Sequence, residues 1–274
     1  MSFLYTKQRG ISLISLMVAS AIGIFLVGAV FKIYLDSKNS FNVRNTLAEV
    51  IENQRFAIDD MRRILVMTGR QIRGVDDQAA ATRPFPALGA GGIEEGNTNN
   101  PDVIAIRYRV GPSCGARQDV DVDTNPTMVR FLINDGDELI CEMTTYDAAG
   151  TATTVSRVMA SNTTLLKVLY GVDDDDDGYA DRYLIASKVN DAAVVTTPDG
   201  ANTPWARAVS IRFSLVSRSD SELPTSARPS SPPELNVLGM AYGDNAGETD
   251  TNHLFRVATA TVSLRNLNPT VQRQ

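Results

Sequence analysis

The chain is poor in the residues that most catalytic and metal sites require. Its 274 residues include only two cysteines and one histidine. Two cysteines cannot build a zinc-ribbon cluster, and a single histidine leaves little room for histidine-based catalysis. That histidine, His253, lies in a polar segment with no obvious nucleophile beside it, so we expect it at the surface. We find no catalytic constellation and expect a protein that is not an enzyme.

Positive charge is also scarce. Lys and Arg together number 26 against 32 Asp and Glu, which gives a net charge of −6. This balance argues against nucleic acid as a partner, because phosphate contacts need a basic face. Hydrophobic residues make up 43% and charged residues 21% of the chain, an ordinary globular composition that excludes collagen-like and wholly disordered proteins.

No charged residue occurs in residues 11–31. As a helix this run is roughly 30 Å long, which matches the hydrocarbon core of a bilayer. The preceding residues 1–10 carry Lys7 and Arg9, and positive residues stay on the cytoplasmic side. We therefore expect a single pass through the inner membrane over 11–31, with the rest of the chain in the periplasm. An uncleaved signal anchor is an alternative interpretation of the same start.

The helical pattern continues beyond the apolar run, and no proline occurs before Pro84. One helix is predicted over about 11–68, roughly 85 Å long, with Gly69 as its C-terminal stop. Apolar residues recur in its second half at spacings of three, four and seven, opposite a charged side: Val43, Leu47, Val50, Ile51, Ala57, Ile58, Met61, Ile64 and Leu65. This stripe must be buried, and we expect it to pack on a sheet of the same chain.

Residues 69–274 show period-two patterns instead. Apolar residues alternate with polar ones in four places, which predicts strands: 104–110, 131–133 with 139–143 around the turn 134–137, 209–215 and 257–265. Loops are predicted over 70–100 and 221–253. The expected fold class is α+β, a long helix packed on an antiparallel β-sheet head.

Several segments carry a family resemblance. Residues 10–19, GISLISLMVA, resemble the type III signal of type IV pilins, GFSLIELMVA, and residues 37–69 are similar to the helix of the PilW family of minor pilins. Further stretches that match this family are LYGVDDDDDGYADRYL (169–184), WARAVSIRFSLVSRS (205–219) and FRVATATVSLRN (255–266). The signal alone indicates only a pilin-like protein, whereas the four stretches together favour PilW over a secretion pseudopilin.

The resemblance implies a type IV pilin-like fold and processing by a prepilin peptidase, which would remove the leader 1–10 after Gly10 and methylate Ile11. Ile11 stands where the family usually has Phe. Ser15 stands where most pilins have Glu, which is thought to pair with the N-terminal amine of a neighbouring subunit. An unpaired carboxylate is costly in lipid, whereas a serine hydroxyl can bond to a helix carbonyl. We hypothesise that Ser15 marks a subunit at or near the pilus tip; drift at a tolerant position, or recruitment by the head alone, is the alternative.

Cys114 and Cys141 are the only cysteines and fall in the segment expected to face an oxidising compartment. One intramolecular disulfide is the only possible internal pairing, and it would stabilise the fold by roughly 3.5 kcal/mol. Two buried free thiols are the alternative, because Cys141 lies on an apolar strand face. The wide separation of the two residues argues against a redox-catalytic pair.

The acidic run within 173–184 resembles a calcium loop. Asp173, Asp175, Asp177 and Asp181 take positions 1, 3, 5 and 9, Gly178 takes position 6, and the Tyr179 carbonyl takes position 7. Position 12 is Leu184 rather than Glu, so a Ca²⁺ site of modest affinity outside an EF-hand is predicted. A solvated acidic turn without a metal is the alternative. A second acidic run, Asp119, Asp121 and Asp123, lacks the glycine and is expected to be a charged loop.

The resemblance implies a minor pilin that joins other minor pilins in a tip complex, which primes polymerisation of the major pilin. Roles in adhesion and twitching motility would follow from that position. A type II secretion pseudopilin and a membrane-anchored adhesin or sensor domain are the alternatives. Of the remaining candidates, Trp205 is expected to pack in the core or at a sheet edge.

Overall fold

The fold was analysed in a computed structural model, which describes residues 13–72, 83–97, 99–115, 119–121, 125–147, 149–197, 203–242 and 250–267. The chain divides into two compact units, Met1–Asn45 and Thr46–Gln274. Helix α1 (Leu13–Leu65) runs through both units, and its residues in the first unit are almost all exposed. The second unit contains the sheets.

The second half of α1 buries one side, as the apolar stripe predicts. Six residues of α1 are buried: Val50, Gln54, Ala57, Met61, Ile64 and Leu65. Two details differ from the prediction. Ile51 is 40% exposed, and Gln54 is buried in the stripe, where its Nε2 donates a hydrogen bond of 2.9 Å to the carbonyl of Arg256. A polar side chain fits there because the neighbouring strands offer carbonyl oxygens as acceptors.

Helix α1 ends at Leu65, three residues before the predicted end near 68. The N–H groups of Met67 and Thr68 donate to the carbonyls three residues back, which tightens the last turn. Gly69 follows with a φ of 75°, the left-handed conformation that a helix stop requires. Its N–H donates to the carbonyl of Arg107 at 2.9 Å, which ties the helix end to the first strand.

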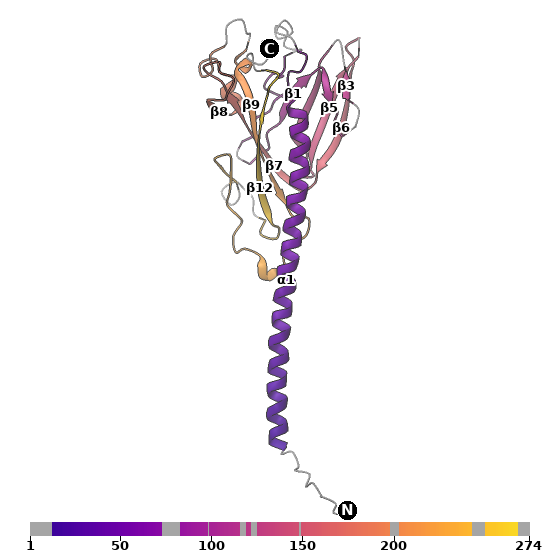
Figure 1. The fold of residues 1–274 in the computed structure, drawn as a ribbon, viewed down its shortest axis with the longest axis vertical. Coiled ribbons are helices and arrows are strands. Elements are labelled where there is room, and N and C mark those ends of the chain that lie inside the picture. Colours follow the sequence, from indigo (N-terminus) through magenta and orange to yellow (C-terminus); the bar gives the residue numbers. More distant parts are fainter. Residues whose placement is uncertain are drawn as a thin grey trace, which may run out of the picture. The chain divides into compact units, whose positions relative to one another are not determined.

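Two four-stranded antiparallel sheets form the second unit (Figure 1). The first has the order β1-β4-β5-β6, and the second has the order β12-β9-β7-β8. The strands of the first sheet are β1 (Ile104–Tyr108), β4 (Thr127–Ile133), β5 (Leu139–Tyr146) and β6 (Ala152–Ala160). Those of the second are β7 (Thr163–Val172), β8 (Arg182–Leu184), β9 (Ala208–Arg218) and β12 (Phe255–Ser263). The α+β class is confirmed.

The predicted hairpin around the turn 134–137 is present and is formed by β4 and β5. Phe131 pairs with Cys141 across the hairpin of β4 and β5, whose turn contains Asp137 at a φ of 55°. In β9, Ile211, Phe213 and Leu215 are fully buried. Between and beside the large sheets lie short elements: β2 (Val110–Pro112), β3 (Asp119–Asp121), α2 (Ala186–Val189), η2 (Pro204–Arg207) and η3 (Thr225–Ala227).

Two predictions of irregular structure are wrong in part. Strands β10 (Leu235–Val237) and β11 (Met240–Tyr242) form a hairpin inside the predicted loop 221–253. They were missed because each strand has only three residues, too few for a period-two pattern. Asp119 and Asp121 lie in β3, which pairs with β2, whereas Asp123 lies outside the described residues.

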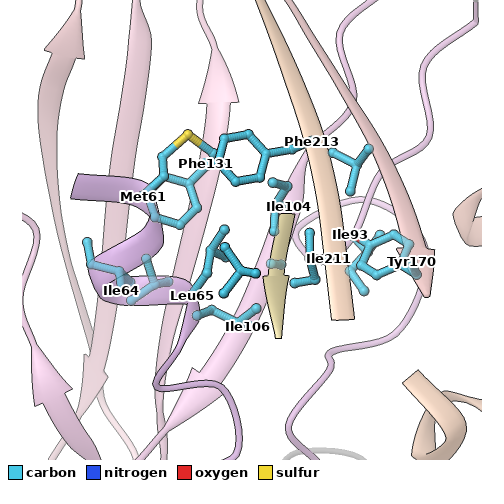
Figure 2. Packing of buried hydrophobic residues seen from close by; sticks show 14 of the residues in the cluster. Met61, Ile64, Leu65, Ile93, Ile104, Ile106, Phe131, Tyr170, Ile211 and Phe213 are labelled. Atoms are coloured by element: carbon cyan, nitrogen blue, oxygen red, sulfur yellow. The ribbon is translucent and has the colours of Figure 1, made fainter. Parts of the chain in front are cut away.

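One core joins the helix to both sheets (Figure 2). Met61, Ile64 and Leu65 of α1 meet Ile104 and Ile106 of β1. The same core takes in Phe131 of β4, Tyr170 of β7, and Ile211 and Phe213 of β9. The end of α1 and the two sheets therefore stabilise one another, and their packing sets the position of the loops that follow β7 and β2.

Candidate metal centre, disulfide and membrane segment

Helix α1 contains an apolar segment long enough to cross a membrane. Its most apolar 18-residue window has a mean hydropathy of 2.5, and none of it is buried within the structure. Ser15 lies in the first turn of this exposed segment, and Ser20 Oγ donates to the carbonyl of Leu16 at 2.9 Å. The predicted processing residues Gly10 and Ile11 lie outside the described residues.

The acidic loop joins β7 to β8 and is organised around Asp173. This residue is 3% exposed, and its carboxylate accepts hydrogen bonds from the N–H groups of Asp176 and Gly178, both at 2.7 Å. The loop turns through Asp176 at a φ of 63° and Gly178 at 89°. Glycine adopts that second angle without strain, as the prediction for position 6 requires.

Three of the predicted ligands come together in this loop. One carboxylate oxygen each from Asp173, Asp175 and Asp177 lies within 4.8 Å of the other two, so the group could hold a metal ion. Asp181 is used differently, because its Oδ2 accepts the Asp174 N–H at 2.8 Å and closes the neck of the loop. The Tyr179 side chain is 77% exposed.

Two arginines, which the sequence analysis missed, neutralise the other aspartates of the run. Arg182 Nη2 donates to Asp174 Oδ1 at 3.0 Å, and Arg207 Nη1 donates to Asp176 Oδ1 at 2.6 Å. The same Arg207 nitrogen donates to the Asp173 carbonyl at 3.3 Å. These bonds hold the second and fourth aspartates away from the triad. The five carboxylates of the run thus separate into an outer pair with cations and an inner triad.

The pKa of Asp175 reflects the crowding of the triad. The hydrogen bond from the Asp177 N–H lowers this pKa, but desolvation and the negative charges of Asp177, Asp181 and Asp173 together raise it above the usual value. Like charges held close together disfavour one another's ionised forms. A cation among these oxygens would relieve that repulsion, so the arrangement suits a positively charged ligand.

The two cysteines form a disulfide. Cys114 follows β2 and Cys141 lies in β5, with their Cα atoms 5.7 Å apart and a sequence separation of 27. Both are buried, at 7% and 1% exposure. The bond ties the segment after β2 to the middle of the first sheet, and the alternative of two free thiols is thereby excluded.

A buried lysine forms the polar centre that sequence patterns did not indicate. Lys167 of β7 is 1% exposed, and its ammonium contacts Asp102 Oδ1 at 2.9 Å. It also donates to three carbonyls, those of Gly96 at 3.1 Å, Asn97 at 2.6 Å and Asn100 at 2.8 Å. This centre fastens the irregular segment before β1 onto the second sheet. The only feature of the sequence that could have indicated this polar centre was a lysine within an apolar strand.

The side chains of Trp205 and His253 lie in different environments. Trp205 is 5% exposed and packs against Phe85 and Tyr170 with ring centroids 5.1 and 4.8 Å away, so its predicted place in the core is confirmed. His253 lies at the surface in part, with its side chain 20% exposed and its Nδ1 2.5 Å from Asp250 Oδ2. A local ion pair or hydrogen bond holds it against the surface.

These features define a pilin-like α+β protein: one long helix, apolar in its first part and packed on antiparallel sheets in its second. The profile of the family described as type IV pilus-assembly protein W, PilW, matches residues 127–266, just over half of the chain. The chain belongs to this PilW family, as its motifs predicted. The match extends from β4 to the end of β12 and includes the acidic loop. Family membership points to a type IV pilus-related minor pilin with a structural rather than an enzymatic task.

Among solved structures, the chain is similar to a type IV-like pilin from Thermus thermophilus. The two share 11% sequence identity, and the likeness covers 80% of this chain and 97% of that one with a TM-score of 0.43. No curated protein matches the chain.

Proposed function

We propose that the protein is a minor pilin that joins other minor pilins in a complex at the pilus tip, where it primes polymerisation of the major pilin. The observation that carries the proposal is the continuity of α1, a single helix that is apolar and exposed over residues 13–31 and packed on the head from Val50 onward. Such a helix can hold the head at the membrane and then pack laterally with the helices of other subunits. Adhesion and twitching motility would depend on this protein indirectly, because both require an assembled pilus.

In this proposal the chain enters the inner membrane once, with its head in the periplasm, and later reaches the cell surface in the pilus. A prepilin peptidase removes residues 1–10 after Gly10 and methylates Ile11. The disulfide between Cys114 and Cys141 is consistent with an oxidising compartment. Ser15 in place of the usual Glu favours the tip position, since a subunit there has one neighbour fewer to pair with.

The first experiment is intact-mass analysis and N-terminal sequencing of the protein from native membranes and from sheared pili. We expect a chain that begins at methylated Ile11 and is present in far fewer copies than the major pilin. Deletion of the gene should abolish surface pili, and expression of the full chain should restore them. A chain that retains residues 1–10 and is absent from pili would refute the proposal, and unchanged piliation with impaired secretion would indicate a pseudopilin instead.

We further propose that the acidic triad binds Ca²⁺. The donors are all oxygens, which hard cations prefer, and histidine and thiolate ligands are absent from the described part of this loop. Asp173, Asp175 and Asp177 would hold the ion, and the Tyr179 carbonyl and Asp181 would complete its shell after a small adjustment. The ion would stiffen the connection between β7 and β8.

Calcium should therefore stabilise the full chain in detergent. A hundredfold excess over the dissociation constant adds about 2.7 kcal/mol to the free energy of unfolding, measured as a rise in melting temperature that a chelator reverses. Asp175→Asn should weaken binding at least about tenfold. Asp135→Asn, which removes the same charge from an exposed turn, is the matched control. Equal melting temperatures with calcium, with magnesium and with chelator would refute calcium binding. The loop would then be a solvated acidic turn without a metal.

A further inference from the structure

Strand β6 is a long sheet edge with an unusual degree of exposure. It forms one end of the order β1-β4-β5-β6 (Figure 1), and all residues from Ala152 to Val158 are exposed. Among the described residues, no backbone hydrogen bond is made by this stretch outside its ladder with β5. The outward N–H and C=O groups of β6 are thus left to solvent, as a template on which another strand could add.

The other sheet edges are covered or short. The N–H group of Arg107 in β1 donates to the carbonyl of Pro84, and that of Arg109, just after β1, donates to the carbonyl of Arg70. Strand β8 has only three residues, and β12 lies against α1 through the Gln54 bond. Natural proteins blunt exposed edges with proline, lysine or charge. The sequence of β6, ATTVSRVMA, has no proline and only one charged residue. Two of its apolar residues are exposed, Val155 to 53% and Val158 to 45%.

The direction of β6 limits what can pair with it. The Gly69 N–H bonds to Arg107, which pairs with Met128 at the start of β4, so β4 begins beside the C-terminal end of α1. Strand β6 is two antiparallel steps from β4 and runs the same way, opposite to α1 (Figure 1). Antiparallel pairing of two β6 strands would therefore place the second halves of their helices antiparallel, which two subunits anchored in one membrane with the same orientation cannot adopt.

Charge gives no support to the remaining self-pairing, the parallel one. The sequence of β6, ATTVSRVMA, contains no Asp or Glu, so a second copy of the strand offers Arg157 no carboxylate. Arg157 is the only charged residue of the strand and donates to the Gly115 carbonyl. Its guanidinium, on the sheet face that carries Cys141, would instead suit a carboxylate on the added strand.

We infer that β6 is an assembly surface, to which a different membrane-anchored pilin subunit adds an extended strand that carries an acidic residue opposite Arg157. A strand of nine residues spans roughly 30 Å, and one edge buries less than the roughly 1,600 Å² of a typical stable interface. Two subunits anchored in the same membrane need less intrinsic affinity, because tethering raises their effective concentration. This inference rests on the proposed function.

The test is photo-crosslinking of the full chain in cells that produce it natively. A benzoylphenylalanine at Ser156 is the probe on β6, and one at Ser263, an exposed residue of β12, is the control position. We expect the Ser156 probe to give one adduct, whose linked peptide comes from an acidic strand of another subunit with its own N-terminal apolar helix. Val155→Lys, and independently Thr153→Lys, should reduce its yield by about tenfold.

Adducts between two copies of β6, adducts to a protein without such a helix, or equal yields from Ser156 and Ser263 would each overturn the inference. A third probe at Val27, in the apolar part of α1, separates this failure from failure of the proposed function. Adducts from Val27 to other pilins without any from Ser156 would refute only the strand addition. The absence of adducts from both would refute the pilin assembly itself.

Discussion

Replacement of Lys167 by Met should strongly destabilise the head. Methionine has a similar length but cannot donate, so Asp102 keeps only its hydrogen bonds from the Val168 and Gly96 N–H groups, both at 2.9 Å. Removing one partner of a buried ion pair costs roughly 3–5 kcal/mol, because the other charge stays buried. The carbonyls that Lys167 caps lose their donor as well, so we expect a loss of about 4 kcal/mol.

Urea unfolding of the full chain in detergent measures this loss. The single tryptophan, Trp205, is buried in the core and reports unfolding by fluorescence. Lys188→Met, at an exposed position of α2, is the matched control and should change stability by less than about 0.5 kcal/mol. A loss below about 1 kcal/mol for Lys167→Met would refute the argument that this lysine fastens the segment before β1.

The same variant has a defined pH dependence. Burial raises the pKa of Asp102 above its usual value, although hydrogen bonding and charge from Lys167 oppose the rise. Loss of the ammonium strengthens the rise, so the folded variant takes up a proton at a pH where the unfolded chain, with a carboxyl pKa of about 3.9, does not. The variant's stability deficit should therefore be largest at neutral pH and shrink as the pH falls toward that value. A deficit that is constant with pH would contradict the buried carboxylate as its source.

Two further predictions concern covalent and backbone restraints. Joint replacement of Cys114 and Cys141 by Ser should cost roughly 3.5 kcal/mol, since the disulfide spans 27 residues, and reductant should lower the melting temperature of the parent but not of the variant. Gly69→Ala should cost about 2 kcal/mol, because its φ is 75° and an added Cβ would lie 2.3 Å from Leu267 Cδ2. Gly136→Ala, where the nearest atom is 3.4 Å from the added Cβ, is the control in the same melting assay.

Local patterns were sufficient to place a strand in the sequence, although not to predict its burial. The alternation in 209–215 predicted β9, since each residue's face in a strand depends only on its parity. Ser210 and Ser214, on the polar face, are nevertheless buried as well. The turn 134–137 also predicted the hairpin of β4 and β5. The acidic run likewise predicted the triad, because Asp173, Asp175 and Asp177 are brought together by one tight turn.

Long-range polar contacts could not be derived in this way. The pattern of α1 favoured Ile51 in the buried stripe, yet Gln54 is the residue that is buried, at 2% exposure. Its burial depends on carbonyls of β9 and β12, more than 160 positions away in the chain. Arg207, which binds Asp176, was missed for a related reason, since it reaches the loop from η2 only after β7 and β9 have paired.

The sequence by itself determined the long helix with an apolar segment of membrane-crossing length, the α+β class, the family and the acidic triad, because each depends on periodicity or on residues near one another in the chain. Only the tertiary structure decided the burial of Lys167, the separation of the aspartates into paired and unpaired groups, and the exposure of β6 at a sheet edge. The physical reason is that burial of a polar group and exposure of a strand both depend on the neighbours that distant segments supply. A lysine in an apolar strand and a run of Thr and Val have no fixed environment until the sheets are assembled.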